Sequence, residues 1–547
     1  MARTIICPYC FEKFEDDKVL FRSERIIEEE KVLPPGMRDY DDYIKRGHIP
    51  EKRNGSISDE EEMEIKQRNV RNWKYFTPRQ DEVFEAWWKD HGWTDEQAIQ
   101  QSMPEREDPI IDPNQPEDQE YLRSENGNFL YYTNDADPMV SHIVLDDGTV
   151  CMKRICPHCH NTLPENYGRF PVKFIAIIGI AGSGKTVYLS QLFNNMGSIC
   201  AQAGLSSTML NNAANNFVKN NPIAVGRELP ESTVTNRFQL PLFYNISYNE
   251  NRKIVTNTLV FYDIAGENFV QAVPVGMNKF APYVMRSDAV ITLIDPLQFV
   301  HVASMSPDAG IELADTTSAL MTINNYIVQE NSGQATEKPF AVCISKSDLQ
   351  EFVSLIDQAY PALVGPLGVD TSGIMGENGM FERKFNASNY NTILTELSRL
   401  IATLSPQLNA YLNTFISNYA LFAFTALGCS VENRSPVGPI YPKRIGEPLL
   451  WLLQAFGIIG TNDAIEYPGV HTVHCPHCGS GLTRALTLDE RKTTKIEKKQ
   501  IEEEGLLNRL FKQKTREIEV KVEHTMDENY ICEKCNYRWV QDLESSN

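Results

Sequence analysis

A strand-like apolar segment, a run of small residues and a helical pattern follow one another near the middle of the chain. Residues 172–178 are mainly apolar, which is typical of a strand buried in a parallel sheet. Gly-Ile-Ala-Gly-Ser-Gly-Lys-Thr follows at residues 179–186, and a helical pattern begins near Val187. Small residues let a backbone wrap closely around an anion, and the next helix adds its positive dipole end. The pattern therefore predicts a phosphate-binding loop.

The predicted loop supplies both phosphate and metal contacts. Lys185 is expected to reach the β- and γ-phosphates of a nucleotide, and the Thr186 hydroxyl is expected to bind Mg²⁺. Backbone N–H groups of the loop supply the remaining contacts. The nucleotide-binding residues predicted here are Gly179, Ala181, Gly182, Ser183, Gly184, Lys185, Thr186 and Val187.

Alternating and apolar segments downstream predict the rest of a sheet. Residues 238–247 alternate between apolar and polar, and a short polar turn leads into a second strand at 254–262. So short a turn requires antiparallel pairing, because parallel strands need a longer crossover. Asp263 and Gly266 follow, where Asp263 would hold Mg²⁺ through water and the Gly266 N–H would meet the γ-phosphate. Further strands are predicted at 289–294, 340–344 and 419–424, and a closing helix at 448–456.

These elements predict an α/β fold with several domains. Residues 168–460 are interpreted as a three-layer P-loop domain with a mostly parallel sheet and one antiparallel hairpin strand. The chain has 547 residues, which exceeds one ordinary core, so further modules are expected beside this domain.

Cysteine spacing predicts two metal sites. A two-residue gap lets both thiolates of a Cys-x-x-Cys pair face one tetrahedral Zn²⁺, and two pairs complete a structural site. We expect one site from the first two pairs and one from the last two; adjacent histidines are interpreted as neighbours, not ligands. The pairs are Cys7/Cys10, Cys156/Cys159, Cys475/Cys478 and Cys532/Cys535. The other cysteines, interpreted as buried apolar residues, are Cys151, Cys200, Cys343 and Cys429.

This pairing implies two zinc ribbons that flank the P-loop domain, each split by an insertion. The N-terminal ribbon would comprise residues 1–10 and 151–166, around an acidic α+β insertion at 11–150. The C-terminal ribbon would comprise 468–486 and 522–547, around a charged helical insertion at 487–521 that projects as a helix or a hairpin.

The first insertion carries its own start, stop and turn signals. Thr77-Pro78 predicts a helix that runs to about Lys89, and Thr94-Asp95-Glu96-Gln97 is a capping-box pattern for another. Asp146-Asp147-Gly148 predicts a hairpin turn. Strands are expected at 129–133, 140–145 and 149–155. Trp73, Trp87, Trp88 and Trp93 are interpreted as a small core, with an aromatic binding face as the alternative.

Charge and hydropathy exclude some classes of function. A net charge of −21 disfavours nonspecific nucleic-acid binding, because an acidic surface repels phosphates. No apolar run approaches the length of a membrane span, and the N-terminus lacks the apolar core of a secretory signal. We therefore expect a cytoplasmic protein whose acidic surface is solvated or docks a basic partner.

The order G-x-x-x-x-G-K-T, D-x-x-G, x-K-x-D and T-A-L resembles the Ras-like GTPases of the TRAFAC class over about residues 171–459. The carboxylate of Asp348 can accept from N1–H and the 2-amino group of guanine, whereas adenine offers neither donor. The resemblance implies that Lys346 packs its stem on the base and that the Ala426 N–H meets the guanine carbonyl. Ser345 replaces the usual Asn or Thr and keeps only a hydroxyl.

The same resemblance implies a γ-phosphate sensor and slow turnover. Thr233, with Thr235 as the alternative, stands where the family carries the switch I threonine that binds Mg²⁺. Glu267 replaces the usual water-positioning Gln; a carboxylate repels the γ-phosphate, yet it could act as a base. The catalytic residues implied are Lys185, Thr233, Gly266 and Glu267, and Thr186, Thr233 and Asp263 would bind Mg²⁺. Arg227 and Arg237 are candidates for a finger in cis.

The wider pattern narrows the resemblance. A C-P-H-C-H knuckle before the P-loop, L-P-E-S-T and D-I-A-G-E resemble the bacterial double-GTPase group, whose members are often fused to zinc ribbons and encoded in anti-phage or conflict systems. This implies a partner that is a second GTPase or an effector subunit. The prediction is a GTP-dependent switch of a bacterial defence system with GTP or GDP, Mg²⁺ and two structural Zn²⁺. The alternatives are a non-hydrolysing nucleotide-binding scaffold and a P-loop ATPase.

Overall fold

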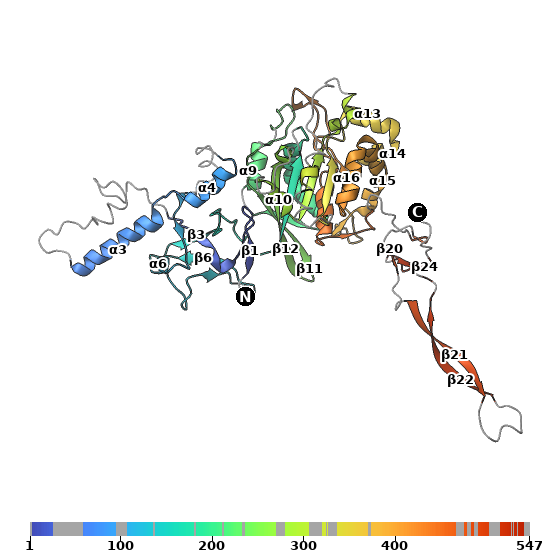
Figure 1. The fold of residues 1–547 in the computed structure, drawn as a ribbon, viewed down its shortest axis with the longest axis horizontal. Helices are drawn as coiled ribbons and strands as arrows, with labels where there is room; N and C mark the ends of the chain where they lie inside the picture. The colour runs from blue at the N-terminus through green and yellow to red at the C-terminus, as the bar shows by residue number, and fades with distance from the viewer. Residues whose placement is uncertain are drawn as a thin grey trace, which may run out of the picture.

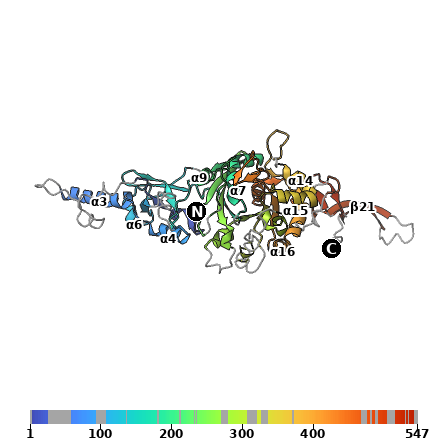
Figure 2. The same ribbon diagram turned by 90° about the horizontal axis from the view of Figure 1, so that it is seen from above.

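The molecule is elongated, with the large sheet near its middle (Figure 1). The N-terminal module lies at one end of this sheet and a β-hairpin extends away at the other, as the turned view also shows (Figure 2). The computed structural model describes residues 3–25, 58–93, 107–134, 137–179, 182–210, 213–231, 233, 236–269, 279–305, 320–323, 325, 336–369, 373–466, 475–478, 483–485, 491–502, 515–526, 528, 530–532 and 534–540.

A seven-stranded sheet forms the centre of the P-loop domain. Only β11 runs against the other six strands, so the mostly parallel sheet and its one reversed hairpin strand are confirmed. The edge strand β10 was not predicted. The three-layer arrangement stays a prediction. In spatial order the strands are β10 (Ser206–Met209), β11 (Leu242–Glu250), β12 (Lys253–Ala265), β9 (Val172–Gly179), β13 (Ala289–Ile294), β14 (Phe340–Ile344) and β16 (Tyr419–Ala423).

The helices of this domain begin at recognisable caps. The Asn386 side chain accepts from Asn389 N at the start of α15, and Ser405 accepts from Leu408 N at the start of α16. The predicted closing helix is α17, one residue earlier than expected. The helices are α7 (Lys185–Asn194), α8 (Met196–Gln202), α9 (Ala213–Asn220), α10 (Ala281–Met285), α11 (Val300–Ala303), α13 (Gln350–Ala359), α14 (Pro361–Gly368), α15 (Ala387–Leu404), α16 (Pro406–Phe415) and α17 (Glu447–Ala455).

The described part of the N-terminal module combines helices with short strands. The predicted helix start at Thr77 is wrong: α4 begins at Glu82, and the Asp81 carboxylate caps it by accepting from Phe84 N at 3.1 Å. Thr77-Pro78 instead follows the end of α3, because a proline disfavours helix in the residue before it. The helices are α3 (Asp59–Phe76), α4 (Glu82–Asp90) and α6 (Pro116–Gln119).

The strands of this module include the predicted hairpin. β6 and β7 pair antiparallel around Gly148, whose φ is 94°. The capping box at 94–97 lies outside the described residues. The strands are β1 (Thr4–Ile6), β2 (Lys13–Glu15), β3 (Leu20–Arg22), β4 (Ile110–Ile111), β5 (Tyr131–Tyr132), β6 (Val140–Val144), β7 (Val150–Cys151) and β8 (Lys153–Ile155).

The C-terminal module corrects a second expectation. Within its described residues the charged insertion, expected to be helical in pattern and to project as a helix or a hairpin, is a β-hairpin: β21 (Lys492–Glu502) and β22 (Thr515–Thr525) pair antiparallel over their full lengths. The sequence Glu-Ile-Glu-Val-Lys-Val-Glu at 517–523 alternates with the period of a strand, and this alternation outweighs its charged composition. Figure 1 shows the hairpin extending away from the three short strands β20 (Thr483–Ala485), β23 (Tyr530–Cys532) and β24 (Arg538–Trp539).

The buried residues divide unequally between the modules. One continuous core includes Cys7 and Phe11 of the N-terminal module together with the central sheet. Among the described residues, a second cluster comprises Cys475, Cys532 and Trp539, with Tyr530 and Cys535 packed against it. Trp73, Trp88 and Trp93 are buried and Trp87 is half-buried, so the tryptophans form a core rather than a binding face. Cys151, Cys200 and Cys343 are buried as expected.

Candidate nucleotide site and metal centres

The phosphate-binding segment joins β9 to α7. Gly182 and Gly184 adopt φ of 86° and 76°, left-handed values that a residue with a Cβ adopts only at a cost. A Cβ at Gly179 would lie 2.4 Å from Ser183 Oγ, so the turn also needs glycine there. The buried Ser183 hydroxyl has no hydrogen-bond partner among the described residues. Ala181 lies outside the described residues.

Four residues predicted to surround the γ-phosphate and Mg²⁺ converge at the start of α7. The Lys185 ammonium forms a buried ion pair with the Asp263 carboxylate and donates to Thr233 Oγ1 at 2.5 Å. Thr233 Oγ1 also lies 3.3 Å from Asp263 Oδ2 and 3.4 Å from Thr186 Oγ1. A buried ammonium needs such a partner, because burial of an unpaired charge is costly. The cluster offers two hydroxyls and a carboxylate, which are ligands that Mg²⁺ prefers. Thr235, the alternative to Thr233, lies outside the described residues.

The residues predicted to recognise the base lie beyond β14 and β16. Lys346 has a φ of 49°, and its ammonium pairs with the buried Asp295 carboxylate at 2.6 Å. Ser345 is buried and donates from its hydroxyl to Ile294 O at 3.1 Å, so it braces the end of β13. Asp348 is exposed and lines a cavity, as does the half-buried Ala426. The turn at Ala426 is held because Thr425 Oγ1 accepts from Gly428 N at 2.9 Å.

One cavity of about 690 Å³ joins the two ends of the site. This volume is in the usual range of small-molecule sites. Two predicted residues, Asp263 and Gly266, are not among those that line the cavity. Asp263 is paired with Lys185, and Gly266 is buried at the start of a short 3₁₀ turn (Gly266–Phe269). The predicted residues that line the cavity are Gly179, Gly182, Ser183, Gly184, Lys185, Thr186, Val187, Thr233, Glu267, Lys346, Asp348 and Ala426.

Three further residues at this site were not predicted from the sequence as site residues. Asp295 follows the buried strand β13, and that position alone could have marked it. Cys429 lines the cavity and is half-buried, so its interpretation as a core residue is wrong. Arg434 also lines the cavity, from a hairpin that no motif indicated. Arg237, a candidate finger, instead stacks its guanidinium 3.7 Å from the centre of the Trp93 ring.

The first two cysteine pairs meet in one cluster. Cys7 Sγ lies 3.6 Å from Cys159 Sγ, and Cys10 Sγ lies 3.8 Å from Cys156 Sγ. A tetrahedral Zn²⁺ with Zn–S bonds of about 2.3 Å separates its sulfurs by about 3.8 Å. Burial raises the pKa of the Cys7 and Cys159 thiols, so a cation is needed to hold four thiolates together here. The donor set and its spacing fit a structural Zn²⁺.

The last two pairs form a second cluster with the same spacing. Cys475 Sγ lies 3.7 Å from Cys535 Sγ, and Cys478 Sγ lies 3.6 Å from Cys532 Sγ. Knuckles in both modules share one turn: His160 N donates to Cys156 O and Asn536 N donates to Cys532 O. This cluster also fits a structural Zn²⁺, and Cys478 is exposed.

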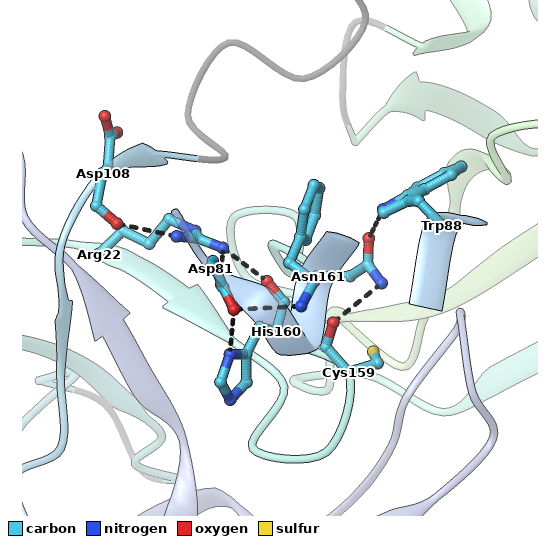
Figure 3. Close-up of polar contacts among 8 residues, drawn as sticks. Arg22, Asp81, Trp88, Asp108, Cys159, His160 and Asn161 are labelled. Carbon is cyan, nitrogen blue, oxygen red and sulfur yellow. Dashed lines mark hydrogen bonds and ion pairs between the residues drawn. The ribbon is translucent and has the colours of Figure 1, made fainter. Parts of the chain in front are cut away.

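A buried polar network links the turn at Cys156 and Cys159, called the second knuckle, to α4 (Figure 3). The Asp81 carboxylate pairs with the Arg22 guanidinium at 2.7 Å and with His160 Nδ1 at 2.8 Å. Trp88 Nε1 donates to Asn161 Oδ1 at 2.9 Å. Burial alone would raise the pKa of Asp81. Hydrogen bonds from His160 and Phe84 N and the charge of Arg22 outweigh burial, so the pKa of Asp81 lies below its ordinary value. His160 is therefore a neighbour of the cluster that orients the knuckle.

The turn at Cys7 and Cys10, called the first knuckle, is hydrogen-bonded directly to the P-loop domain. The Tyr262 hydroxyl donates to Pro8 O and the Tyr283 hydroxyl donates to Tyr9 O, both at 2.7 Å. Tyr262 immediately precedes Asp263, and both tyrosines are buried. Phe11, just after the knuckle, packs against both rings. The N-terminal metal cluster is thus bonded to the strand that carries a predicted Mg²⁺ ligand.

A second contact joins the end of α4 to the segment after Thr233. Phe238 N donates to His91 O at 3.0 Å, and Trp93 Nε1 donates to Phe238 O at 2.8 Å. A Cβ at Gly92 would lie 1.9 Å from Asn236 O, so this close approach requires glycine. The ammonium of Lys279 pairs with the Asp90 carboxylate at the exposed edge of the contact.

A relative and several solved structures resemble parts of the chain. The chain is 24% identical to the putative ESX-1 scaffolding and assembly protein SaeC of Mycolicibacterium smegmatis over 329 residues, which cover 56% of this chain and 80% of SaeC. No protein-family model matches the chain. No helix in the described part of the chain is long and apolar enough to cross a membrane.

Solved structures that resemble parts of the chain include proteins bound to GDP or GTP. Sup35 complexed with GDP is 9% identical, with 50% of this chain and 43% of that one covered and a TM-score of 0.19. The T. maritima FeoB G domain is 12% identical, with 35% and 83% covered and a TM-score of 0.15. The GTP-bound GTPase-like domain of S. cerevisiae Ski7 is 11% identical, with 61% and 56% covered and a TM-score of 0.23. The chain spans less than half of the Sup35 chain.

Proposed function

We propose that the chain is a guanine-nucleotide-dependent switch that hydrolyses GTP slowly. One observation carries this proposal: a single cavity is lined at one end by Gly182, Lys185 and Thr186, and at the other by Asp348 and Ala426. The residues proposed to bind the phosphates and those proposed to bind the base thus line the same cavity.

Binding uses charge at one end and hydrogen bonding at the other. Lys185 would exchange part of its pairing with Asp263 for phosphate oxygens, while Thr186 and Thr233 offer hydroxyls beside it. Bound Mg²⁺ would neutralise phosphate charge, and Thr186, Thr233 and Asp263 are the residues that would hold it. The Asp348 carboxylate would accept from the guanine edge, which an adenine cannot match.

Hydrolysis is expected to be slow without a partner. Glu267 lines the cavity at the position inferred for water orientation, and its negative charge opposes the approach of a γ-phosphate. Arg237 is engaged with Trp93 and so does not supply a positive group to the cavity in this arrangement. A partner that contributes a cation would raise the rate.

The nucleotide state would be passed to the N-terminal module. Asp263 follows Tyr262, which bonds to the first knuckle, and Thr233 precedes the segment that bonds to α4. Movement of either segment on γ-phosphate contact would strain these bonds. The module would then present the state to a protein partner.

A second candidate role concerns assembly. The name of SaeC describes a putative scaffolding and assembly protein, and the alignment covers most of that relative. A nucleotide-controlled assembly factor would use the same switch with other partners. The defence role stays a prediction from the motif resemblance, as does a second GTPase as partner.

Calorimetry of the full chain with GTP, GDP and ATP tests the proposal. We expect both guanine nucleotides to bind, ATP to bind at least about 100-fold more weakly, and Lys185→Ala to abolish binding. Asp348→Ala should remove the guanine preference, whereas Asp357→Ala, an exposed aspartate on α13, should not. Equal affinity for ATP and GTP would refute the guanine assignment. Phosphate release from GTP, measured with the chain in the absence of a partner, distinguishes a GTPase, which releases phosphate slowly, from a scaffold, which releases none.

A further inference from the structure

A small hairpin contributes to the lining of the cavity. β17 (Val431–Glu432) and β18 (Ser435–Pro436) pair antiparallel around Asn433-Arg434, whose φ values of 46° and 60° define a tight two-residue turn. The hairpin leaves the Ala426 turn directly, and Val431 and Arg434 line the cavity. Gly428 anchors it, because a Cβ there would lie 2.1 Å from Tyr441 O.

The hairpin is fastened to the switch I segment, defined here as residues 226–231 and Thr233. Gly226 N donates to Pro436 O and Leu229 N donates to Arg434 O, both at 2.8 Å. The Arg434 guanidinium returns the contact: Nη2 donates to Leu229 O at 3.4 Å, and Nη1 pairs with Glu228 Oε1 at 3.3 Å. Four interactions therefore hold two segments that are about 205 residues apart in sequence.

The contacts between the hairpin and the switch I segment lie beside the cavity, where we expect the middle of a bound nucleotide. The residues of the two segments that line the cavity include Leu229, Pro230, Ser430 and Val431. Thr233, four residues beyond Leu229, lies at the phosphate end, whereas Ala426 lies at the base end. The four contacts between hairpin β17–β18 and the switch I segment, called the clasp below, therefore join segments that lead to both ends of the cavity.

We propose that Arg434 is a positioning residue that retains bound guanine nucleotide by fastening hairpin β17–β18 to the switch I segment. The inference rests on the proposed nucleotide-binding function. A nucleotide leaves only when the clasp opens, so the contacts act on the dissociation rate more than on the association rate. The clasp also joins the base-recognition turn to the segment that carries Thr233.

The chain offers a matched control for Arg434. Asn251-Arg252 forms the turn between β11 and β12 with φ values of 52° and 67°, so both hairpins carry an Asn-Arg turn of the same hand. Arg252 is exposed at the start of β12, whose 13 residues separate it from the phosphate end by about 40 Å at about 3.3 Å per residue.

Release of fluorescently labelled GDP from the full chain, chased with excess unlabelled GDP, tests the proposal. We expect Arg434→Ala to release GDP about fivefold faster, with an unchanged association rate and unchanged thermal stability of the protein without nucleotide. Glu228→Ala should show a smaller increase. Arg434→Lys should recover part of the retention, because an ammonium keeps the Glu228 pair, and Arg252→Ala should match wild type.

Three outcomes would overturn the inference. Release from Arg434→Ala within twofold of wild type would show that the clasp does not retain nucleotide. An equal acceleration in Arg252→Ala would show a general effect of turn substitution. Failure of the wild-type chain to bind GDP or GTP would refute the proposed function as well, and so it differs from the first two results.

Discussion

The two four-cysteine modules use the same ligand spacing in different surroundings. In the N-terminal module, Cys7 belongs to the same buried core as the central sheet, and the backbone of its knuckle accepts bonds from Tyr262 and Tyr283. In the C-terminal module, Cys475 and Cys532 share a small separate core with Trp539. The metal site alone therefore does not define the role of such a module. Its contacts decide whether it shares a core with the P-loop domain.

The largest expected effect separates the two modules by loss of a ligand. Cys7→Ser should lower the free energy of unfolding of the P-loop domain by about 5 kcal/mol, because metal binding and folding are linked there. Cys475→Ser should leave the main thermal transition unchanged, because its cluster is separate. Scanning calorimetry with zinc analysis of each variant checks this, and each should lose about one zinc of two.

Equal losses of stability in the two cysteine variants would break the comparison. That result would mean that the C-terminal cluster also supports the central core. Retention of two zinc ions by either variant would instead refute the assignment of that cysteine as a ligand.

A smaller effect is expected where the first knuckle meets the sheet. Tyr283→Phe should cost about 1–3 kcal/mol, because the Tyr9 carbonyl loses its buried partner. Tyr411→Phe is the matched control, since its hydroxyl also donates to a backbone carbonyl, Leu320 O, at 2.7 Å. Both variants should lose similar stability in urea unfolding. Only Tyr283→Phe should release zinc faster to a chelator; equal release rates would show that the hydroxyl does not brace the knuckle.

Sequence patterns predicted the centre of the fold better than its edges. β13 and β14 have the expected bounds, because a strand buried on both faces is a continuous apolar run. The start of α4 was misplaced, because Thr77-Pro78 has the composition of a helix start although the preceding helix ends there. The insertion at 487–521 was expected to be helical because its many charges obscured a period of two.

The candidate site divides in the same way. Local motifs singled out Lys185, Asp263 and Asp348 as candidates, because chemistry and spacing are both present within a few residues. Arg434 was not predicted, because its place depends on a contact with Leu229, which is distant in sequence. Such contacts depend on tertiary packing that no local pattern encodes.

Acidification should modestly weaken the contact between the end of α4 and the segment around Phe238, called the junction below. Burial is the main cause that lowers the pKa of His91 below its ordinary value of 6.5, so the folded state favours the neutral ring. Its contribution to stability is therefore full above pH 6.5 and is lost as the pH falls through the lower folded-state pKa. His91→Gln should flatten this dependence in urea unfolding between pH 7.5 and 5.

A matched histidine tests whether the effect belongs to the junction. Burial also lowers the pKa of His142, which stacks on Tyr131 within the N-terminal module. Both substitutions should change the pH dependence of stability. Only His91→Gln should change the pH dependence of GDP affinity, because the His91 ring packs against the Phe238 ring in the segment after Thr233. An equal change in His142→Gln would place the coupling elsewhere in the module.

The smallest effect is expected at the exposed edge of the same junction. Lys279 and Asp90 are 49% and 61% exposed, so Lys279→Ala should cost at most about 0.5 kcal/mol, and less at high salt. The Arg399–Glu396 pair on α15, whose arginine is exposed and whose glutamate is half-buried, is the control, and a double-mutant cycle on each pair by urea unfolding gives the coupling energy. A coupling above about 1.5 kcal/mol at Lys279–Asp90 would contradict this expectation. A weak edge beside the buried bonds of Tyr262 and Tyr283 would let the junction open at its rim while the knuckle stays anchored. That combination is what a module needs in order to follow a switch without separating from it.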